Sequence, residues 1–378
     1  CDASGNVDSM TNPDGAKTRY RYVGGDLAEV IDAKGGVTRL TYDALGRTTS
    51  ITTADNAVSF MAYDVNDRLV SYTDAIGAVT SLDHDGNGNV TGIHLPNGSF
   101  ISYDYDAMNR VIARYDALGN AERRTYNANG NIENLVDRKG QVTTFSYDEI
   151  DRPVLLTYAD GSETRVTYDK GDRMVSLLDS SSGELAWSYD DMDHVLSESS
   201  AGGVVRYAFD ESGRRSQMVL DAGEPVEYGY DDENRTSWIA HGPSRYDISY
   251  DGAGRRESLR FPNGMHAGYG YDAIGRLLHL TYEGSAGDEL WKASYSYDAM
   301  GRRVSEQNGP VSAPGLLDEV TPMDGTFDAS SQIAQRAGTP FNYDKNGNLV
   351  SDGRKEYRWD ARNRLAAIKE GGVESPKP

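Results

Sequence analysis

The segment from Asp83 to Asn89 has the residue types of a divalent-cation site. It reads Asp-His-Asp-Gly-Asn-Gly-Asn, which places side-chain oxygens at alternate positions, as in calcium-binding loops. Such a loop closes with a bidentate glutamate at its twelfth position, and here that position is His94. Glycine and asparagine in such a run also favour a tight turn. We therefore interpret the segment as a turn and expect no metal site.

Other side chains that commonly carry catalysis lack the spacing that such sites need. The six histidines show no metal-ligand spacing. A GxSxG nucleophile motif, a Walker loop and a GxGxxG loop are all absent from the sequence. Many aspartates could pair across strands as acid and base, but turns account for most of them. The sequence therefore predicts that the chain is not an enzyme and needs no cofactor or metal.

The dominant feature of the chain is a motif that returns every 20 or 21 residues. Tyrosine and aspartate are followed, after two further residues, by Gly, Asn or Asp and then by Arg or Asn. The tyrosine position is filled in turn by Tyr22, Tyr42, Tyr63, His84, Tyr105, Tyr126, Tyr147, Tyr168, Tyr189, Phe209, Tyr230, Tyr250, Tyr271, Tyr297, Tyr343 and Trp359. A fixed period of this length indicates a repeat array. An array of one repeated unit favours a surface or container over a catalytic site.

These residues resemble the YD repeats of the Rhs family, which includes bacterial polymorphic toxins, cage subunits of insecticidal toxin complexes and teneurins. The resemblance covers nearly the whole chain. The residues expected to carry it are Tyr42, Asp43, Gly46, Arg47, Tyr63, Asp64, Arg68, Tyr105, Asp106, Arg110, Tyr147, Asp148, Arg152, Tyr271, Asp272, Gly275, Arg276, Tyr297, Asp298, Gly301 and Arg302.

The resemblance implies an all-β fold, in which a repetitive antiparallel β-hairpin array curls into part of a hollow Rhs-type shell. It further implies a non-catalytic shell segment that encapsulates a C-terminal toxin cargo, with the remainder of the same shell and the toxin polypeptide as partners. The protein would be exported from a bacterium, either secreted or held at the cell surface. The alternative is a cell-surface adhesion or carbohydrate-contact module that binds surface glycans.

The local pattern independently predicts two strands and two turns in each repeat. Residues two before the repeat tyrosine are mostly apolar, as at Leu40, and the next residue is mostly small or polar, as at Thr41. This alternation is typical of a strand with one apolar face. Glycine or asparagine four residues after the tyrosine supplies a positive φ for a tight turn, and the aspartate can accept hydrogen bonds from the turn backbone. The arginine can offer its guanidinium to an aspartate or a tyrosine ring.

A second turn is expected midway through each unit, for example at Asp74–Gly77 and Asp116–Gly119. About 34 strands spaced ~4.8 Å apart give roughly 160 Å of sheet. Curled once, such a ribbon makes a ring on the order of 50 Å across with open ends. The chain would then wall a cavity without sealing it.

Four tryptophans are the candidates for sugar stacking: Trp187, Trp238, Trp291 and Trp359. Trp187 lies two residues before a repeat tyrosine, and Trp359 occupies the tyrosine position itself. The repeat register therefore favours packing in the sheet for these two rings, and sugar contact is the alternative.

Composition excludes several classes of protein. The formal net charge of −21 argues against partners that attract basic residues, so we expect neither nucleic acid binding nor membrane insertion. Hydrophobic content is 38%, and 25 tyrosines supply rings suited to a half-buried sheet surface. Cys1 is the only cysteine, so the chain cannot form an internal disulfide. Because Cys1 stands 21 residues before Tyr22, we interpret it as part of an array rather than as a lipidated start.

The spacing divides the chain into three parts. Residues 1–308 form the regular YD-repeat array, 309–340 an irregular excursion within it, and 341–378 the final two repeats and a tail. The step from Tyr297 to Tyr343 is 46 residues long, which places the excursion between them. We expect the excursion to leave the sheet and to be replaceable by a short hairpin. The family's core motif and self-cleavage site are missing, so toxin release is not carried over to this chain.

Overall fold

The computed structural model describes residues 1, 4–309 and 325–376, and every regular element in those ranges is a β-strand. None of the described residues form a helix that is long and apolar enough to cross a membrane.

The first part of the chain contains β1 (Ser9–Thr11), β2 (Lys17–Val23), β3 (Asp26–Ile31), β4 (Val37–Tyr42), β5 (Thr48–Thr52), β6 (Val58–Tyr63), β7 (Leu69–Thr73), β8 (Val79–His84), β9 (Val90–His94), β10 (Phe100–Tyr105), β11 (Val111–Tyr115), β12 (Ala121–Tyr126), β13 (Ile132–Val136), β14 (Val142–Tyr147), β15 (Pro153–Thr157) and β16 (Glu163–Tyr168). The ribbon continues with β17 (Met174–Asp179), β18 (Gly183–Tyr189), β19 (Val195–Ser200), β20 (Gly203–Phe209), β21 (Arg215–Leu220), β22 (Val226–Tyr230), β23 (Thr236–His241), β24 (Ser244–Tyr250), β25 (Arg256–Arg260), β26 (His266–Tyr271), β27 (Leu277–Glu283), β28 (Glu289–Tyr297) and β29 (Arg303–Asn308). The C-terminal part contains β30 (Gly325–Phe327), β31 (Ile333–Arg336), β32 (Thr339–Pro340), β33 (Asn342–Tyr343), β34 (Leu349–Ser351), β35 (Lys355–Trp359), β36 (Leu365–Glu370) and β37 (Val373–Pro376).

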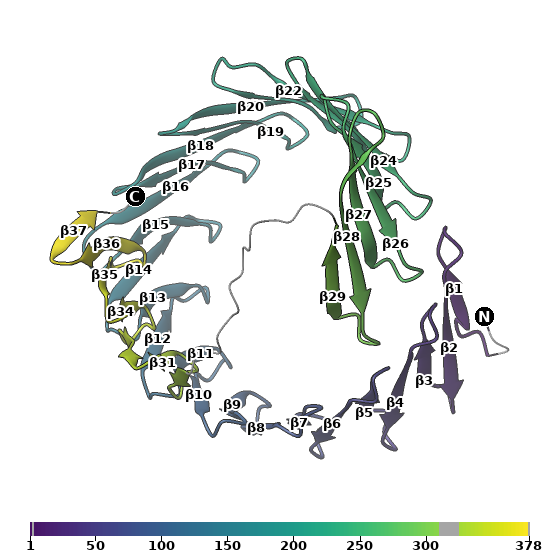
Figure 1. Cartoon of the computed structure of the whole chain (residues 1–378). Helices are drawn as coiled ribbons and strands as arrows, with labels where there is room; N and C mark the ends of the chain where they lie inside the picture. Colours follow the sequence, from purple (N-terminus) through teal and green to yellow (C-terminus); the bar gives the residue numbers. More distant parts are fainter. Residues whose placement is uncertain (2–3, 310–324, 377–378) are drawn as a thin grey trace.

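Strands β1 to β29 form one 29-stranded antiparallel sheet in which each strand pairs with the next along the chain. The ribbon curls into a ring, so that β24–β29 return to the neighbourhood of β1–β4 (Figure 1). Two small sheets, β30–β32 and β33–β37, lie beside the strands from β10 to β18. The predicted all-β hairpin array that curls into part of a hollow shell is confirmed.

The strands show the alternation expected of a sheet with one packed face. In β14, Phe145 and Tyr147 are half-buried, whereas Thr144 and Ser146 are exposed. A register shift lies beside Tyr147, between Ser146 and Tyr147, and recurs beside the other repeat tyrosines. Such a bulge bends and twists the strand that carries it. Repetition of this bend on one rim of the ribbon contributes to its curl.

The sheet is one layer thick and has almost no closed core. Among the described residues, the buried apolar side chains are Ala113, Val166, Ala267, Ala293 and Ala367. The accessible surface is 23189 Å². A compact monomer of this mass, 41.3 kDa, would expose only about 14,800 Å². The excess surface is what a single-layer wall produces, because within residues 4–309 and 325–376 no second layer covers either face of the long sheet.

The ribbon forms a spiral instead of the single ring expected from strand number. The turn between β1 and β2 already meets the turn between β24 and β25, through an ion pair of Asp14 and Arg255. About 24 strands per turn at ~4.8 Å give a ring on the order of 40 Å across, narrower than expected. The remaining strands begin a second turn that lies along the first.

The excursion expected at 309–340 has two parts. Residues 310–324 lie outside the described residues, and residues 325–340 contain β30–β32. Phe327 stands in the tyrosine position there. Asp328 begins a tight turn, and the amide of Asp328 donates to Gln332 O at 2.9 Å. Ser331 takes the positive φ, at 62°. This stretch is a degenerate repeat that sequence reasoning missed, because the tyrosine, glycine and arginine are all replaced.

Candidate functional site

The motif residues build a tight turn at one end of each repeat, here called the YD turn and defined as the five residues from the motif aspartate to the arginine position. In the turn Asp43–Arg47, the amide of Asp43 donates to Arg47 O and that of Gly46 to Asp43 O, both at 3.0 Å. The carboxylate of Asp43 accepts the amides of Leu45 and Arg47 at 2.9 and 3.0 Å. Gly46 has φ 78°, a value that favours glycine, asparagine and aspartate.

Where a YD turn ends in arginine, as at Arg47, that arginine joins its own repeat to the next. Arg47 Nε donates to Asp43 Oδ2 at 2.7 Å, and its Nη1 donates to Asp64 O of the next repeat at 3.0 Å. The guanidinium lies 4.9 Å from the centre of the Tyr63 ring. The Tyr63 hydroxyl in turn donates to Thr48 O at 3.0 Å. The Tyr63 ring, the Arg47 guanidinium and the Asp43 carboxylate therefore form one contact network that joins neighbouring repeats.

The same contacts recur along the rim. The motif aspartates that accept a hydrogen bond from their own arginine are Asp43, Asp64, Asp106, Asp148, Asp272 and Asp298, paired with Arg47, Arg68, Arg110, Arg152, Arg276 and Arg302. The motif tyrosines whose hydroxyls donate to a backbone carbonyl are Tyr42, Tyr63, Tyr105, Tyr147, Tyr271 and Tyr297. Gly275 and Gly301 have φ 86° and 77°. The structure thus arranges these residues in one long network rather than around one point.

Aspartate and asparagine at the glycine position carry contacts that sequence reasoning missed. Asp67 has φ 63° and accepts a hydrogen bond from Arg47 Nη1 at 2.7 Å. Asp172 accepts in the same way from Arg152 at 2.6 Å. Both residues tolerate the left-handed conformation, and their carboxylates add an ion pair to the preceding repeat. The signal was visible as the Gly, Asn or Asp variation at this position.

Hydrogen bonding depresses the pKa of several motif aspartates. The side-chain hydrogen bond from Arg68, with backbone hydrogen bonds, lowers the pKa of Asp64 to about 2, against the opposing effect of burial. For Asp272, burial raises the pKa, but hydrogen bonds from Arg276 and Lys34 outweigh it and leave a value of about 2. These carboxylates therefore remain charged through mildly acidic pH.

In the run from Asp83 to Asn89, the first two residues end β8 and Asp85–Asn89 form an ordinary YD turn. The amide of Asp85 donates to Asn89 O at 3.0 Å, and Asp83 contacts His94 at 2.8 Å. Within the ranges that the structure describes, no group of three or more His, Cys, Asp or Glu is placed to hold a metal ion.

Three of the four tryptophans contact a neighbouring side chain or backbone carbonyl within the sheets. Trp238 lies under Arg245, with the guanidinium carbon 4.5 Å from the ring centre. Trp359 Nε1 donates to Leu349 O at 2.7 Å, and Trp291 meets Tyr282 edge-on at 5.7 Å. Trp187 is half-buried in β18.

The second row of turns, here called mid-repeat turns, lies on the opposite rim and includes Asp32–Gly36 between β3 and β4. The YD turns of later strands meet these turns along a line that we call the seam. Contacts across the seam include Arg255–Asp14 at 3.1 Å, Lys34–Asp272 at 3.2 Å, Arg302–Asp55 at 3.3 Å, Ser99 Oγ to Ala329 O at 2.6 Å, Asn346 Nδ2 to Asp137 Oδ2 at 2.6 Å and Lys139–Asp344 at 3.2 Å. In the described part of the chain, one winding of the spiral is therefore joined to the next through these tight turns and not through strand pairing.

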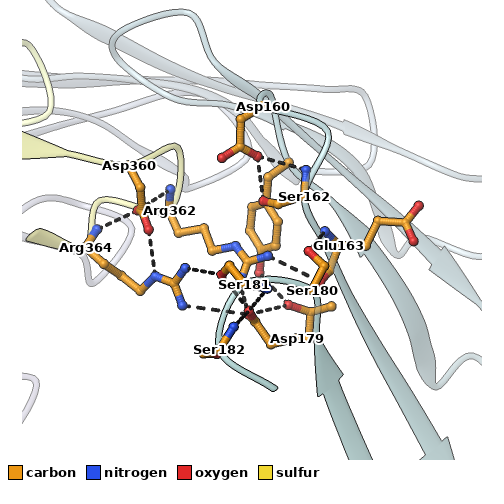
Figure 2. A network of polar contacts seen from close by, with 12 residues as sticks. Asp160, Ser162, Glu163, Asp179, Ser180, Ser181, Ser182, Asp360, Arg362 and Arg364 are labelled. Carbon is orange, nitrogen blue, oxygen red and sulfur yellow. Dashed lines mark hydrogen bonds and ion pairs between the residues drawn. The ribbon is translucent and has the colours of Figure 1, made fainter. Parts of the chain in front are cut away.

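The most buried seam contact joins Arg362 of the C-terminal sheet to Asp179 (Figure 2). Their side chains are 7% and 9% exposed. The guanidinium also lies 4.1 Å from the centre of the Tyr158 ring and donates to Glu163 O at 3.2 Å. Asp179 is fixed by its own turn, because Ser181 donates to it through both amide and hydroxyl. A buried carboxylate held in this way needs a cation opposite it.

Comparison with known proteins agrees with this geometry. The RHS Repeat family model matches residues 23–58, 63–99, 84–121 and 126–163, and the Teneurin YD-shell model matches residues 156–302. Together the two models match well over half of the chain.

Solved structures share the fold at low identity. TcdB2-TccC3 superposes with a TM-score of 0.74 at 14% identity, over 96% of this chain and 26% of that one. The Photorhabdus luminescens Tc holotoxin pore gives a TM-score of 0.64 at 14% identity, over 93% of this chain and 26% of that one. The chain thus spans about a quarter of the length of these structures.

Two curated relatives match over a short stretch. They are the tRNA3(Ser)-specific nuclease WapA of Bacillus spizizenii and the tRNA nuclease WapA of Bacillus subtilis, each 29% identical over 82 residues. The match covers 22% of this chain and only 3% of either relative. It therefore transfers no nuclease activity to this chain. The repeat, the turn network and the two family models together place the chain in the Rhs/YD-repeat family.

Proposed function

We propose that the chain is a non-catalytic wall segment of a shell that encloses a polypeptide cargo, a C-terminal toxin of the same protein. One observation carries this proposal: the sheet is a single layer that curves around a central space and is joined to itself along a seam. A sheet that served only as a scaffold would bury one face under a second layer. A wall needs both faces free.

The turn network explains how such a wall could stand without a core. A repeat whose YD turn ends in arginine, such as Asp43–Arg47, is fastened to the next by charge-assisted hydrogen bonds and a cation–π contact on one rim, in addition to strand pairing. Stability then comes from contacts between neighbours, as in other repeat arrays. The partners of this segment would be the remainder of the shell and the enclosed polypeptide.

Charge favours some contents over others. The net charge of −21 would attract a basic cargo and disfavour nucleic acid or an anionic membrane. We infer an exported protein, secreted or held at the cell surface of a bacterium, because sequestering a toxin protects the cell that makes it.

Protease protection tests enclosure directly. The full-length protein that carries this segment is digested with a nonspecific protease, and its C-terminal cargo is compared with the same cargo expressed alone. Enclosure predicts that the cargo survives within the folded shell and is cleaved once the shell is denatured. Equal digestion rates for the free and the shell-attached cargo would contradict the proposal.

The adhesive alternative is favoured by a line of four rings across β24–β28. Tyr246, Phe261, Tyr282 and Trp291 follow one another with centroid separations of 6.0, 6.2 and 5.7 Å. Such a line could stack on a glycan, although the edge-on contact of Tyr282 with Trp291 uses part of these rings. A glycan array with no signal above background would count against this alternative.

A further inference from the structure

The ion pairs across the seam each join a charged residue of a YD turn to a charged residue of a mid-repeat turn. In a regular YD turn the first residue is aspartate and the fifth is arginine, as in Asp272–Arg276. The turn therefore presents both signs of charge a few ångströms apart. The side chain that reaches it from the mid-repeat turn is often the third residue of that turn.

The third residues that form ion pairs across the seam have either sign, and each meets the opposite one. Asp14 is a third residue that meets an arginine, Arg255, at 3.1 Å. Asp55 follows the same rule and contacts Arg302 at 3.3 Å.

Where the third residue is lysine, it meets the aspartate of the YD turn. Lys34 Nζ lies 3.2 Å from Asp272 Oδ2, and that carboxylate is only 6% exposed. Lys139 Nζ lies 3.2 Å from Asp344 Oδ2 in the same arrangement. The two lysine contacts join residues 238 and 205 positions apart in sequence, so local chain geometry does not produce them.

Two irregular YD turns show the rule most clearly. The turn Asp344–Asn348 ends in asparagine, so it lacks the arginine of the pair, and its one cation, Lys345, is exposed at the second position; Asp344 meets Lys139. The turn Asp360–Arg364 contains an extra arginine, Arg362, and it meets Asp179. In both turns the charged residue that faces the seam meets the opposite sign across it.

We propose that the aspartate–arginine pair of the YD turn has a second role, as a two-signed receptor for a charged residue of a mid-repeat turn, and that this contact closes the spiral. The proposal concerns closure of the wall and does not depend on what the wall encloses. A two-signed receptor accepts a charge reversal on the opposite side, because the partner moves to the other end of the pair. A YD turn that lacks the arginine at its fifth position does not.

Two lysines allow a matched comparison, because each uses its ammonium group in an ion pair across the seam. Lys34→Glu faces a complete pair, and Arg276 lines the same cavity of about 260 Å³ as Lys34. Lys139→Glu faces Asp344 without an arginine at position 348. Lys170→Glu makes the same charge change at an exposed residue of another YD turn and serves as control.

The measurement is hydrogen exchange by mass spectrometry on the intact chain, in peptides that span the facing YD turns. We expect Lys139→Glu to speed exchange at residues 341–350 by roughly five-fold or more, since a partly buried pair is lost and like charges meet. Lys34→Glu should change exchange at residues 271–278 by less than roughly two-fold. Lys170→Glu should change neither peptide.

Adding Asn348→Arg to Lys139→Glu completes the pair and should bring exchange back to within roughly two-fold of the unmodified chain. If Lys139→Glu loosens the whole sheet, the double variant still tests the proposal. A restored aspartate–arginine pair should return exchange to its original rate, whereas a general folding defect would leave exchange fast. Failure of the rescue overturns the proposal. An effect of Lys34→Glu as large as that of Lys139→Glu also overturns it, as does a Lys139→Glu variant indistinguishable from Lys170→Glu.

Discussion

Replacing Gly46 by valine should loosen the hairpin between β4 and β5 through backbone strain alone. Gly46 has φ 78°, and a Cβ added there meets no atom within 4 Å, so no steric clash contributes. A β-branched residue in this conformation costs about 1–3 kcal/mol. Because repeats contact mainly their neighbours, the cost falls on local opening, which should increase by about 5- to 150-fold.

The assay is hydrogen exchange in a peptide that spans β4 and β5, with two comparison variants. Gly86→Val, measured in a peptide that spans β8 and β9, is the control, since Gly86 also has open space around it but lacks a positive φ. Gly46→Asn should be tolerated, because Asn109 and Asn234 occupy the same turn position with φ 61° and 62°. Equal exchange in Gly46→Val and Gly86→Val would refute the strain argument.

Three further predictions concern other parts of the network. Hydrogen bonds hold the pKa of Asp272 at about 2 although burial raises it, so its contribution to stability is present above pH ~4 and is lost as the pH falls towards 2. Thermal melts should therefore be flat from pH 7 to 5 and fall below pH 4, and a melting temperature that is unchanged down to pH 2 would contradict this. Tyr63→Phe loses the hydroxyl that donates to Thr48 O at 3.0 Å and should cost about 1 kcal/mol, less than Tyr63→Ala, in exchange measurements on β6–β7. Ala293→Leu should cost about 1–3 kcal/mol by overpacking a side chain that is 0% exposed, whereas Ala107→Leu on an exposed turn should leave the thermal melt unchanged.

The sequence predicts those parts of the fold that each repeat encodes locally. Alternation before Tyr147 gives a strand, Gly46 gives a turn, and Asp43 with Arg47 gives the hydrogen bonds that close it. These features depend on residues within about one repeat of each other, so the spacing along the chain suffices. The degenerate repeat at Phe327 was missed because it keeps the turn geometry while it replaces the residues that identify it.

The seam could not be predicted in the same way. Which mid-repeat turn meets which YD turn depends on the curvature of the ribbon, and small bends at each bulge accumulate over some 24 strands. Lys34 and Asp272 look like ordinary turn residues in the sequence, and only the closed spiral brings them together. The expected ring was too wide for the same reason, because strand number alone sets the length of a ribbon and not its curvature.

Cryo-electron microscopy of the full-length protein that carries this segment tests the central claim most directly. The account predicts a wall one sheet thick around a central space, with successive turns of the sheet joined rim to rim and further density inside. A solid particle, or a second layer packed against either face of this sheet, would contradict it.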